Sequence, residues 1–128
     1  MKHSIRLFVS LVVPALMLAF ATATPAMKHE AEKGKAVQKV LHEDDKVRVT
    51  ETTLKPGDVG ANTTRGFRVS RMLSGGTWER TYADGKKEKV ERKTGDVRVA
   101  GPDKQAYFNT NTGKTTVVFY TVNIKGVK

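Results

Sequence analysis

The 128-residue sequence contains no cysteine. Disulfide bonds and thiolate metal sites are therefore excluded, and so is a lipid anchor, which needs a cysteine to carry the lipid. Histidine is scarce as well, because it occurs only at positions 3, 29 and 42. Beyond residue 20 no long stretch keeps the 3.6-residue apolar period of an amphipathic helix. The bulk of the chain therefore lacks the pattern of a helical protein.

The long apolar run of the sequence lies near its start, at residues 7–20, and follows the basic residues Lys2 and Arg6. Small residues come directly after it, at residues 21–26, in the order typical of a secretory signal peptide. The run is shorter than the roughly 20 residues that cross a bilayer as a helix, and Pro14 interrupts it. We therefore expect no stable membrane insertion.

Cleavage after Ala23 or after Ala26 fits the small-residue rule, and we favour Ala26. This predicts a signal peptide at residues 1–26 and a periplasmic or secreted mature protein. Removing 26 of the 128 residues leaves 102, enough for one domain with a modest core. The removed segment holds two of the 23 basic residues and none of the 13 acidic ones, so the mature net charge is +8.

This positive charge is spread along the chain, because lysine and arginine alternate with glutamate and threonine instead of forming a block. A basic protein attracts nucleic acid or other anions in principle. An exported protein meets no genomic DNA, however, so we expect no nucleic-acid partner. The charge instead favours acidic small molecules or anionic components of the cell envelope.

A polar leader at residues 27–35 has too few apolar residues to fold against anything. After it, short runs rich in Val, Thr, Phe and Tyr alternate with turn residues such as Asp84-Gly85. The eight runs are residues 36–41, 46–54, 66–73, 77–82, 87–93, 96–100, 105–109 and 115–125. Residues 42–45 between the first two runs are all polar, which predicts a solvated turn whose aspartate bonds its own backbone. The pattern predicts an all-β domain over residues 36–128, built as a sandwich or barrel.

Four segments of this domain resemble a small single-domain cupin. They read LKPGD at 54–58, RMLSGGTWERTYADG at 71–85, KTGDVRVAGP at 93–102 and NTGKTTVVFYTV at 111–122. The residues that frame the two cupin motifs are present, namely Gly57, Gly75 or Gly76, Gly95, Pro102 and Asn111. The resemblance implies a small cupin-type β-barrel, a jelly roll of about eight strands, and it allows a homodimer.

The resemblance also indicates which residues stand at the metal-ligand positions of a cupin. Depending on a one-residue choice in the alignment, the His-x-His pair falls on Thr63 and Arg65 or on Asn62 and Thr64, the glutamate on Val69 or Arg68, and the last histidine on Tyr107. Transition metals prefer imidazole, carboxylate or thiolate donors that converge on one point. None of these side chains is such a donor, so we expect no metal and no cofactor.

The segment from residue 63 to residue 73 supplies a candidate ligand site. If the side chains alternate, one face carries Arg65, Phe67, Val69, Arg71 and Leu73 and the other carries Arg68, Ser70 and Met72. The first face has more apolar weight, so we assign it to the core. This brings one or two guanidinium groups to the place where a cupin holds its metal, and a guanidinium fits a carboxylate or phosphate.

The predicted ligand-binding residues are Arg65, Arg68 and Tyr107, with Asn62 and Thr63 at the rim. A competing interpretation has the two arginines at the barrel mouth or paired with Glu79 or Glu91.

These observations lead to the hypothesis of an exported, non-catalytic cupin-like protein that binds a small anionic ligand without metal. No Ser–His pair or carboxylate pair stands out as a catalytic group. Two alternatives stay open. One is a metal-independent isomerase or lyase that uses Tyr107 or a carboxylate as general acid or base. The other is a structural or assembly protein of the cell envelope, whose basic hairpin at residues 77–93 docks on an acidic partner.

Overall fold

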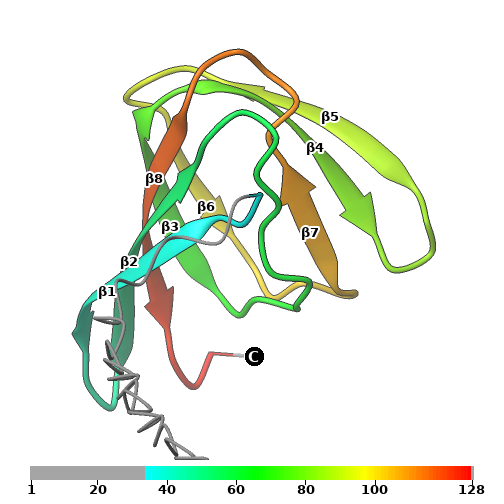
Figure 1. Cartoon of the computed structure of the whole chain (residues 1–128). Coiled ribbons are helices and arrows are strands. Elements are labelled where there is room, and N and C mark those ends of the chain that lie inside the picture. The colour runs from blue at the N-terminus through cyan, green and yellow to red at the C-terminus, as the bar shows by residue number, and fades with distance from the viewer. Residues whose placement is uncertain (1–33, 128) are drawn as a thin grey trace, which may run out of the picture.

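All eight predicted runs form β-strands in the structure, a computed structural model that describes residues 34–127 (Figure 1). The strands are β1 (Val37–Glu43), β2 (Val47–Leu54), β3 (Arg68–Ser74), β4 (Gly76–Tyr82), β5 (Lys87–Arg92), β6 (Val97–Ala100), β7 (Tyr107–Thr110) and β8 (Val117–Ile124). The predicted signal peptide at residues 1–26, and residues 27–33 of the predicted leader, lie outside the described residues. The described part contains no helix that is long and apolar enough to cross a membrane.

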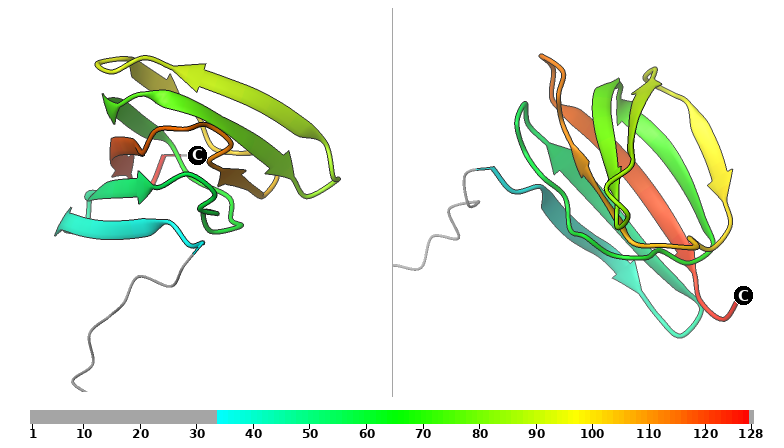
Figure 2. Two further views of the ribbon diagram at one scale, coloured as in Figure 1. Left: turned by 45° about the horizontal axis from the view of Figure 1, so that its top comes forward. Right: turned by 90° about the vertical axis from the view of Figure 1, so that its right-hand side faces the viewer.

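The strands form two antiparallel sheets that face each other (Figure 2). One sheet has the strand order β1-β2-β8-β3-β6 and the other has the order β5-β4-β7. The last strand, β8, lies in the middle of the larger sheet and pairs with β2 on one side and β3 on the other. The larger sheet is therefore joined only when the C-terminal strand is in place. The all-β prediction is confirmed.

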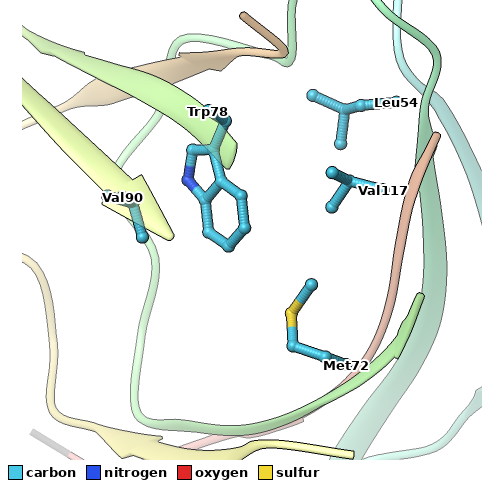
Figure 3. Packing of buried hydrophobic residues seen from close by; sticks show 5 residues of the cluster. All are labelled: Leu54, Met72, Trp78, Val90 and Val117. Atoms are coloured by element: carbon cyan, nitrogen blue, oxygen red, sulfur yellow. The ribbon is translucent and has the colours of Figure 1, made fainter. Parts of the chain in front are cut away.

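An apolar cluster packs between the two sheets (Figure 3). Trp78 and Val90 reach into it from the smaller sheet, where they are direct cross-strand partners. Leu54, Met72 and Val117 meet them from the larger sheet. Met72 and Val117 are each only 1 % exposed. Burying such side chains stabilises the fold by about 1.5–3 kcal/mol each, so this cluster holds the two sheets together.

The structure corrects the predicted faces of β3. Met72 is buried in the core, and Arg68 and Ser70 line the interior with it. Leu73, predicted to face the core, is 44 % exposed, and Arg71 is exposed as well. The assignment of Val69, Arg71 and Leu73 to the core face was therefore wrong.

The outer face of the larger sheet explains the error. Val69 stands beside Val99 of β6 and Val122 of β8, in a row of valines on the outside. Val99 is 61 % exposed. Since both faces of β3 carry apolar residues, their relative weight does not identify the inner face. The assumed alternation also breaks before β3, because residues 64–66 form no strand, and this allows Arg65 and Arg68 to reach the same interior.

The turns follow their local sequence. Gly57 and Gly95 have φ angles of +86° and +90°, a backbone conformation that strains any residue with a Cβ. In the β1–β2 turn, Asp44 Oδ1 accepts hydrogen bonds from the N–H groups of Lys46 and Val47, each at 2.8 Å. The predicted aspartate–backbone bonding is observed, but the turn is shorter than the predicted residues 42–45, because His42 and Glu43 are the last residues of β1.

Asn111 ties the two sheets together near the apolar cluster. This side chain is only 2 % exposed. Its Nδ2 donates to the carbonyl oxygens of Leu54 and Thr115, each at 2.8 Å, and its Oδ1 accepts from the N–H of Gly113 at 3.0 Å. A buried amide costs free energy unless its hydrogen bonds are made. Here two bonds stay within the β7–β8 loop, and the bond to Leu54 ties this loop to the end of β2.

Candidate functional site

Beyond the apolar cluster the two sheets enclose an open cavity of about 1070 Å³. Its floor includes Met72, Trp78 and Phe119. The inner face of the larger sheet lines it with a row of hydroxyl residues, Thr50, Ser70 and Thr121, which are neighbours across β2, β8 and β3. The barrel interior is thus hollow and polar above an apolar base, which is the arrangement of a small-molecule site.

The cavity wall carries a large excess of positive charge. Its basic residues are Arg48, Arg65, Arg68, Arg80, Arg92, Arg98 and Lys125, and its acidic residues are Glu43 and Asp103. A concave site with one sign of charge and walls of low dielectric concentrates its field and attracts ions of the opposite sign. The cavity therefore favours anions.

Arg68 and Asp103 form the central ion pair of the wall. Arg68 Nη2 lies 2.8 Å from Asp103 Oδ1 and 3.0 Å from the Tyr107 hydroxyl, and its Nη1 contacts three backbone carbonyls. Asp103 Oδ2 also accepts the backbone N–H of Arg65 at 2.8 Å. The predicted partners Glu79 and Glu91 are not used by either arginine: Arg65 and Arg68 both pair with Asp103. Nothing in the sequence motifs marked Asp103.

Arg65 holds the loop before β3 against Tyr107. Its guanidinium donates to the carbonyl oxygens of Ala61, Thr63 and Tyr107 at 3.0–3.2 Å. Its Cζ also lies 4.1 Å from the centroid of the Tyr107 ring, within the range of a cation–π contact. Burial lowers the pKa of Arg65, because the charged form is partly desolvated. Most donors of this side chain are thus bonded to the protein itself.

Arg80, on β4, is the second guanidinium over Tyr107, with its Cζ 4.3 Å from the ring centroid. Burial by itself lowers the pKa of Arg80. The hydrogen bond with the Tyr82 hydroxyl and the electrostatic interactions with Tyr107, Tyr82 and Glu88 outweigh burial, so the pKa is raised above its usual value. The nearest carboxylate oxygen, on Glu88, is 3.8 Å from Nη1, and the Arg80 side chain is 15 % exposed. Arg80 therefore stays charged at the cavity wall, in a long ion pair with Glu88 that is beyond hydrogen-bond distance.

Four buried polar atoms have no hydrogen-bond partner among the described residues. They are Arg48 Nε, Trp78 Nε1, Arg80 Nε and Asn109 Oδ1. All four residues line the cavity. Three come from the smaller sheet, where Arg80 and Asn109 are direct cross-strand partners and Trp78 lies two residues from Arg80. Buried polar atoms are normally bonded, and exceptions call for an explanation such as a ligand or an ion.

Of the predicted ligand-binding residues, the structure brings Thr63, Arg65, Arg68 and Tyr107 together on the cavity wall. Asn62 is exposed and is not among the residues that line the cavity. Sequence reasoning missed Arg80, Arg48 and Trp78. The alternation of side chains along β4 and β2 could have placed these residues on one face of each strand. The sequence does not reveal, however, which of the two faces points inward.

The donors in the cavity do not fit a transition metal. Among residues 34–127, no three His, Cys, Asp or Glu side chains come together as a metal site requires. His42 is bonded to Asp44 in the β1–β2 turn, with its side chain 59 % exposed. Asp103, an acidic residue of the cavity wall, is paired with Arg68. The guanidinium groups around Tyr107 would repel a cation, so this donor set suits an anion instead.

Several solved structures resemble the fold of this chain. A cupin domain from Bordetella pertussis Tohama I superimposes with a TM-score of 0.64 at 20 % identity, covering 72 % of this chain and 95 % of that one. A cupin superfamily protein from Desulfitobacterium hafniense gives 0.53 at 18 % identity, covering 74 % and 82 %. A sugar phosphate isomerase of the cupin superfamily from Silicibacter pomeroyi gives 0.51 at 13 % identity, covering 70 % and 59 %.

No protein-family model matches the sequence, and no curated protein matches it. At these identities the structural likeness establishes the fold. The described residues have the fold of a small cupin barrel, as the resemblance of the four sequence segments implied.

Proposed function

We propose that this cupin-fold protein is exported and that it binds a small organic anion in its barrel cavity, without metal and without catalysing a reaction. The observation that carries the proposal is the set of four buried polar atoms that make no hydrogen bond within the described residues, all of which belong to residues of the cationic cavity. Three of these atoms are N–H donors, on Arg48, Trp78 and Arg80. A carboxylate or phosphate accepts bonds from such donors and offsets the positive charge around them.

The residues of the wall divide into two roles under this proposal. Arg80 is the principal ligand-binding cation, because its Nε is unpartnered and its acidic neighbour is beyond hydrogen-bond distance. Arg65 and Arg68 bind mostly protein acceptors, so they position Tyr107 and the loop before β3 and add positive charge to the site. Thr63 lies at the rim, and Asn62 beside it is exposed.

Binding is tested by isothermal titration calorimetry and thermal-shift measurements on metal-free protein with a panel of organic acids at constant ionic strength. We expect at least one carboxylate to bind and to raise the melting temperature. Loss of a hydrogen bond to a charged group costs about 1.5–3 kcal/mol, so Arg80→Ala should weaken binding about 10- to 100-fold. Arg65→Ala should weaken it less.

The matched control is Arg71→Ala, which removes the same side chain from the exposed outer face of β3. It should leave affinity within about twofold, because a distant exposed charge is screened. Two results would overturn the proposal: no response to any acid of the panel, or equal affinities of the Arg80→Ala and Arg71→Ala proteins.

Export rests on the residues at positions 1–26, whose basic start, apolar run and small residues fit a signal peptide. The test is expression of the full chain in a bacterial host, followed by cell fractionation and N-terminal sequencing. We expect mature protein outside the cytoplasm that begins at Met27. An uncleaved cytoplasmic product would contradict export without affecting the binding proposal.

A second candidate function is a metal-independent isomerase or lyase. One contact favours it: the Tyr107 hydroxyl lines the cavity and accepts a hydrogen bond from Arg68 at 3.0 Å, so a ligand proton could exchange with a positioned phenol. The cupin-fold sugar phosphate isomerase suggests a substrate class for the assay. Turnover of a sugar phosphate or keto acid by the wild type, with loss of turnover in Tyr107→Phe, would establish catalysis and overturn the non-catalytic proposal.

A further inference from the structure

A second cationic group lies in the cavity, apart from the arginines around Tyr107. Arg92, the last residue of β5, reaches across to the larger sheet. Its Nη1 donates to Ser70 Oγ at 3.3 Å, and its Nη2 donates to the carbonyl oxygen of Asp96 at 3.2 Å. Both acceptors are uncharged, so these bonds fix the guanidinium at the cavity wall without neutralising it.

Arg98, on β6, is the second member of this group. It is the direct cross-strand partner of Ser70 and lines the same cavity. Within residues 34–127, no carboxylate oxygen lies within 4.0 Å of either Arg92 or Arg98. Arg92 and Arg98 thus both lie beside Ser70, and neither forms an ion pair with a described residue.

The electrostatics of Arg92 agree with this geometry. Burial lowers its pKa, and the positive charges of Arg98 and Arg80 lower it further, while Asp96 opposes them. Arg92 therefore experiences cations from both parts of the cavity. A small ligand that neutralises Arg92 and Arg98 would also lie within the field of Arg80.

The distance between the two cationic groups follows from the spacing of residues along β3. Arg68 stands two residues before Ser70 on this strand, both facing the cavity. Two residues of a strand span about 7 Å. The first cationic group consists of Arg80, Arg65 and Arg68 and lies near Tyr107. The second group, Arg92 and Arg98, lies about two residues farther along β3. The hydroxyl row of Thr50, Thr121 and Ser70 leads to the second group.

From this arrangement we infer that the ligand carries two anionic groups on a short polar linker, with one group bound at Arg80 and the other between Arg92 and Arg98. Dicarboxylic acids and phosphorylated carboxylic acids have this chemistry. The inference rests on the proposed function, and it adds the ligand class and a second subsite to it. A guanidinium pair matches an anionic group because its planar forks donate several bonds at once.

The test compares dicarboxylates with monocarboxylates of equal carbon number: succinate with butyrate, glutarate with pentanoate, and adipate with hexanoate. Affinities are measured by calorimetry on the full mature chain at constant ionic strength. We expect the best dicarboxylate to bind at least about 10-fold more tightly than its monocarboxylate, equivalent to about 1.4 kcal/mol.

Arg98→Ala is the decisive variant, because Arg98 is exposed on a short edge strand and makes no hydrogen bond to another described side chain. It should reduce the preference for the dicarboxylate to about twofold or less. Arg71→Ala, on the outer face of β3, should retain the full preference. Arg92→Ala should act like Arg98→Ala if its fold, checked by circular dichroism, is intact.

The outcomes separate this inference from the proposed function. If monocarboxylates bind as tightly as dicarboxylates, or if Arg98→Ala keeps the wild-type preference, the second subsite is wrong while anion binding stands. If no acid binds at all, both proposals fail.

Discussion

Arg68 and Asp103 stand 35 positions apart in the sequence and meet as an ion pair at 2.8 Å, with only 12 % of each side chain exposed. The pair connects the start of β3 to the loop before β7, and it places the Tyr107 hydroxyl within reach of Arg68. Removing one partner of a buried pair leaves an uncompensated charge, which costs more than the pair contributes. The wall of the cavity therefore depends on Asp103 for its stability.

Asp103→Ala should lower the free energy of unfolding by about 3 kcal/mol, because Arg68 then stays partly buried without its carboxylate. Urea denaturation followed by tryptophan fluorescence measures this. The control is Lys87→Ala, which breaks an exposed pair with Glu79 and should cost about 0–1 kcal/mol. Equal effects of the two substitutions would show that the Arg68–Asp103 pair contributes no more to the free energy of unfolding than an exposed ion pair.

Met72→Ala should lower the free energy of unfolding by about 2–5 kcal/mol, since it removes a side chain that is 1 % exposed and leaves a cavity in the apolar cluster. Leu73→Ala, one position along, should cost about 0.5 kcal/mol or less, because this side chain is on the outer face. The same denaturation experiment compares the two. The opposite ranking would restore the face assignment that the sequence suggested.

Asp44 should make stability fall in acid. The hydrogen bond with His42 and the N–H groups of Val47 and Lys46 lower the pKa of Asp44 from 3.8 to about 2. A depressed folded-state pKa means that the stabilisation is present above pH 3.8 and is lost as the pH falls toward 2. Asp44→Asn should therefore be less stable than the wild type at neutral pH, and this difference should shrink between pH 4 and pH 2.

Melting temperatures of both proteins across this pH range test the expectation, and an NMR titration of the Asp44 carboxyl gives its pKa directly. A carboxyl that titrates at its ordinary value would contradict the bonded turn.

Gly75→Ala should destabilise the protein by at least about 1–3 kcal/mol. A Cβ at this position would lie 2.6 Å from the backbone nitrogen of Thr94 and still closer to the carbonyl oxygen of Arg92. Backbone atoms cannot swing aside as a flexible side chain can. Gly101→Ala is the control, because nothing lies within 4 Å of its added Cβ; it should be neutral or stabilising by up to about 1 kcal/mol. Thermal unfolding measures both, and a stable Gly75→Ala protein would contradict this packing.

The strands were predictable because their signals are local. Apolar and β-branched residues in short runs, separated by residues such as Gly57 and Gly95, specify extended segments and turns whatever the segments later pair with. The cupin likeness rests on the same turn residues, so it identified the barrel. It also brought Arg65, Arg68 and Tyr107 to one cavity, since these positions lie at fixed places in that barrel.

The faces and partners were not predictable in the same way. Arg80, Arg92 and Arg98 come from three strands, and each reaches the cavity through strand pairing across the sheets. Asp103 is an ordinary loop aspartate in the sequence and becomes the partner of two arginines only when its loop folds beside β3. Such contacts depend on which distant strands pair and in which register, and a short stretch of sequence does not contain this information.

By itself, then, the sequence determined an all-β cupin barrel with a basic interior segment, because alternation and turn chemistry are properties of neighbouring residues. Only the tertiary structure decided which face of β3 is inner, which arginines are neutralised and which keep donors for a ligand. Those properties depend on charges and side chains that are distant in the chain, and a guanidinium is free or paired according to what folding places within about 4 Å of it.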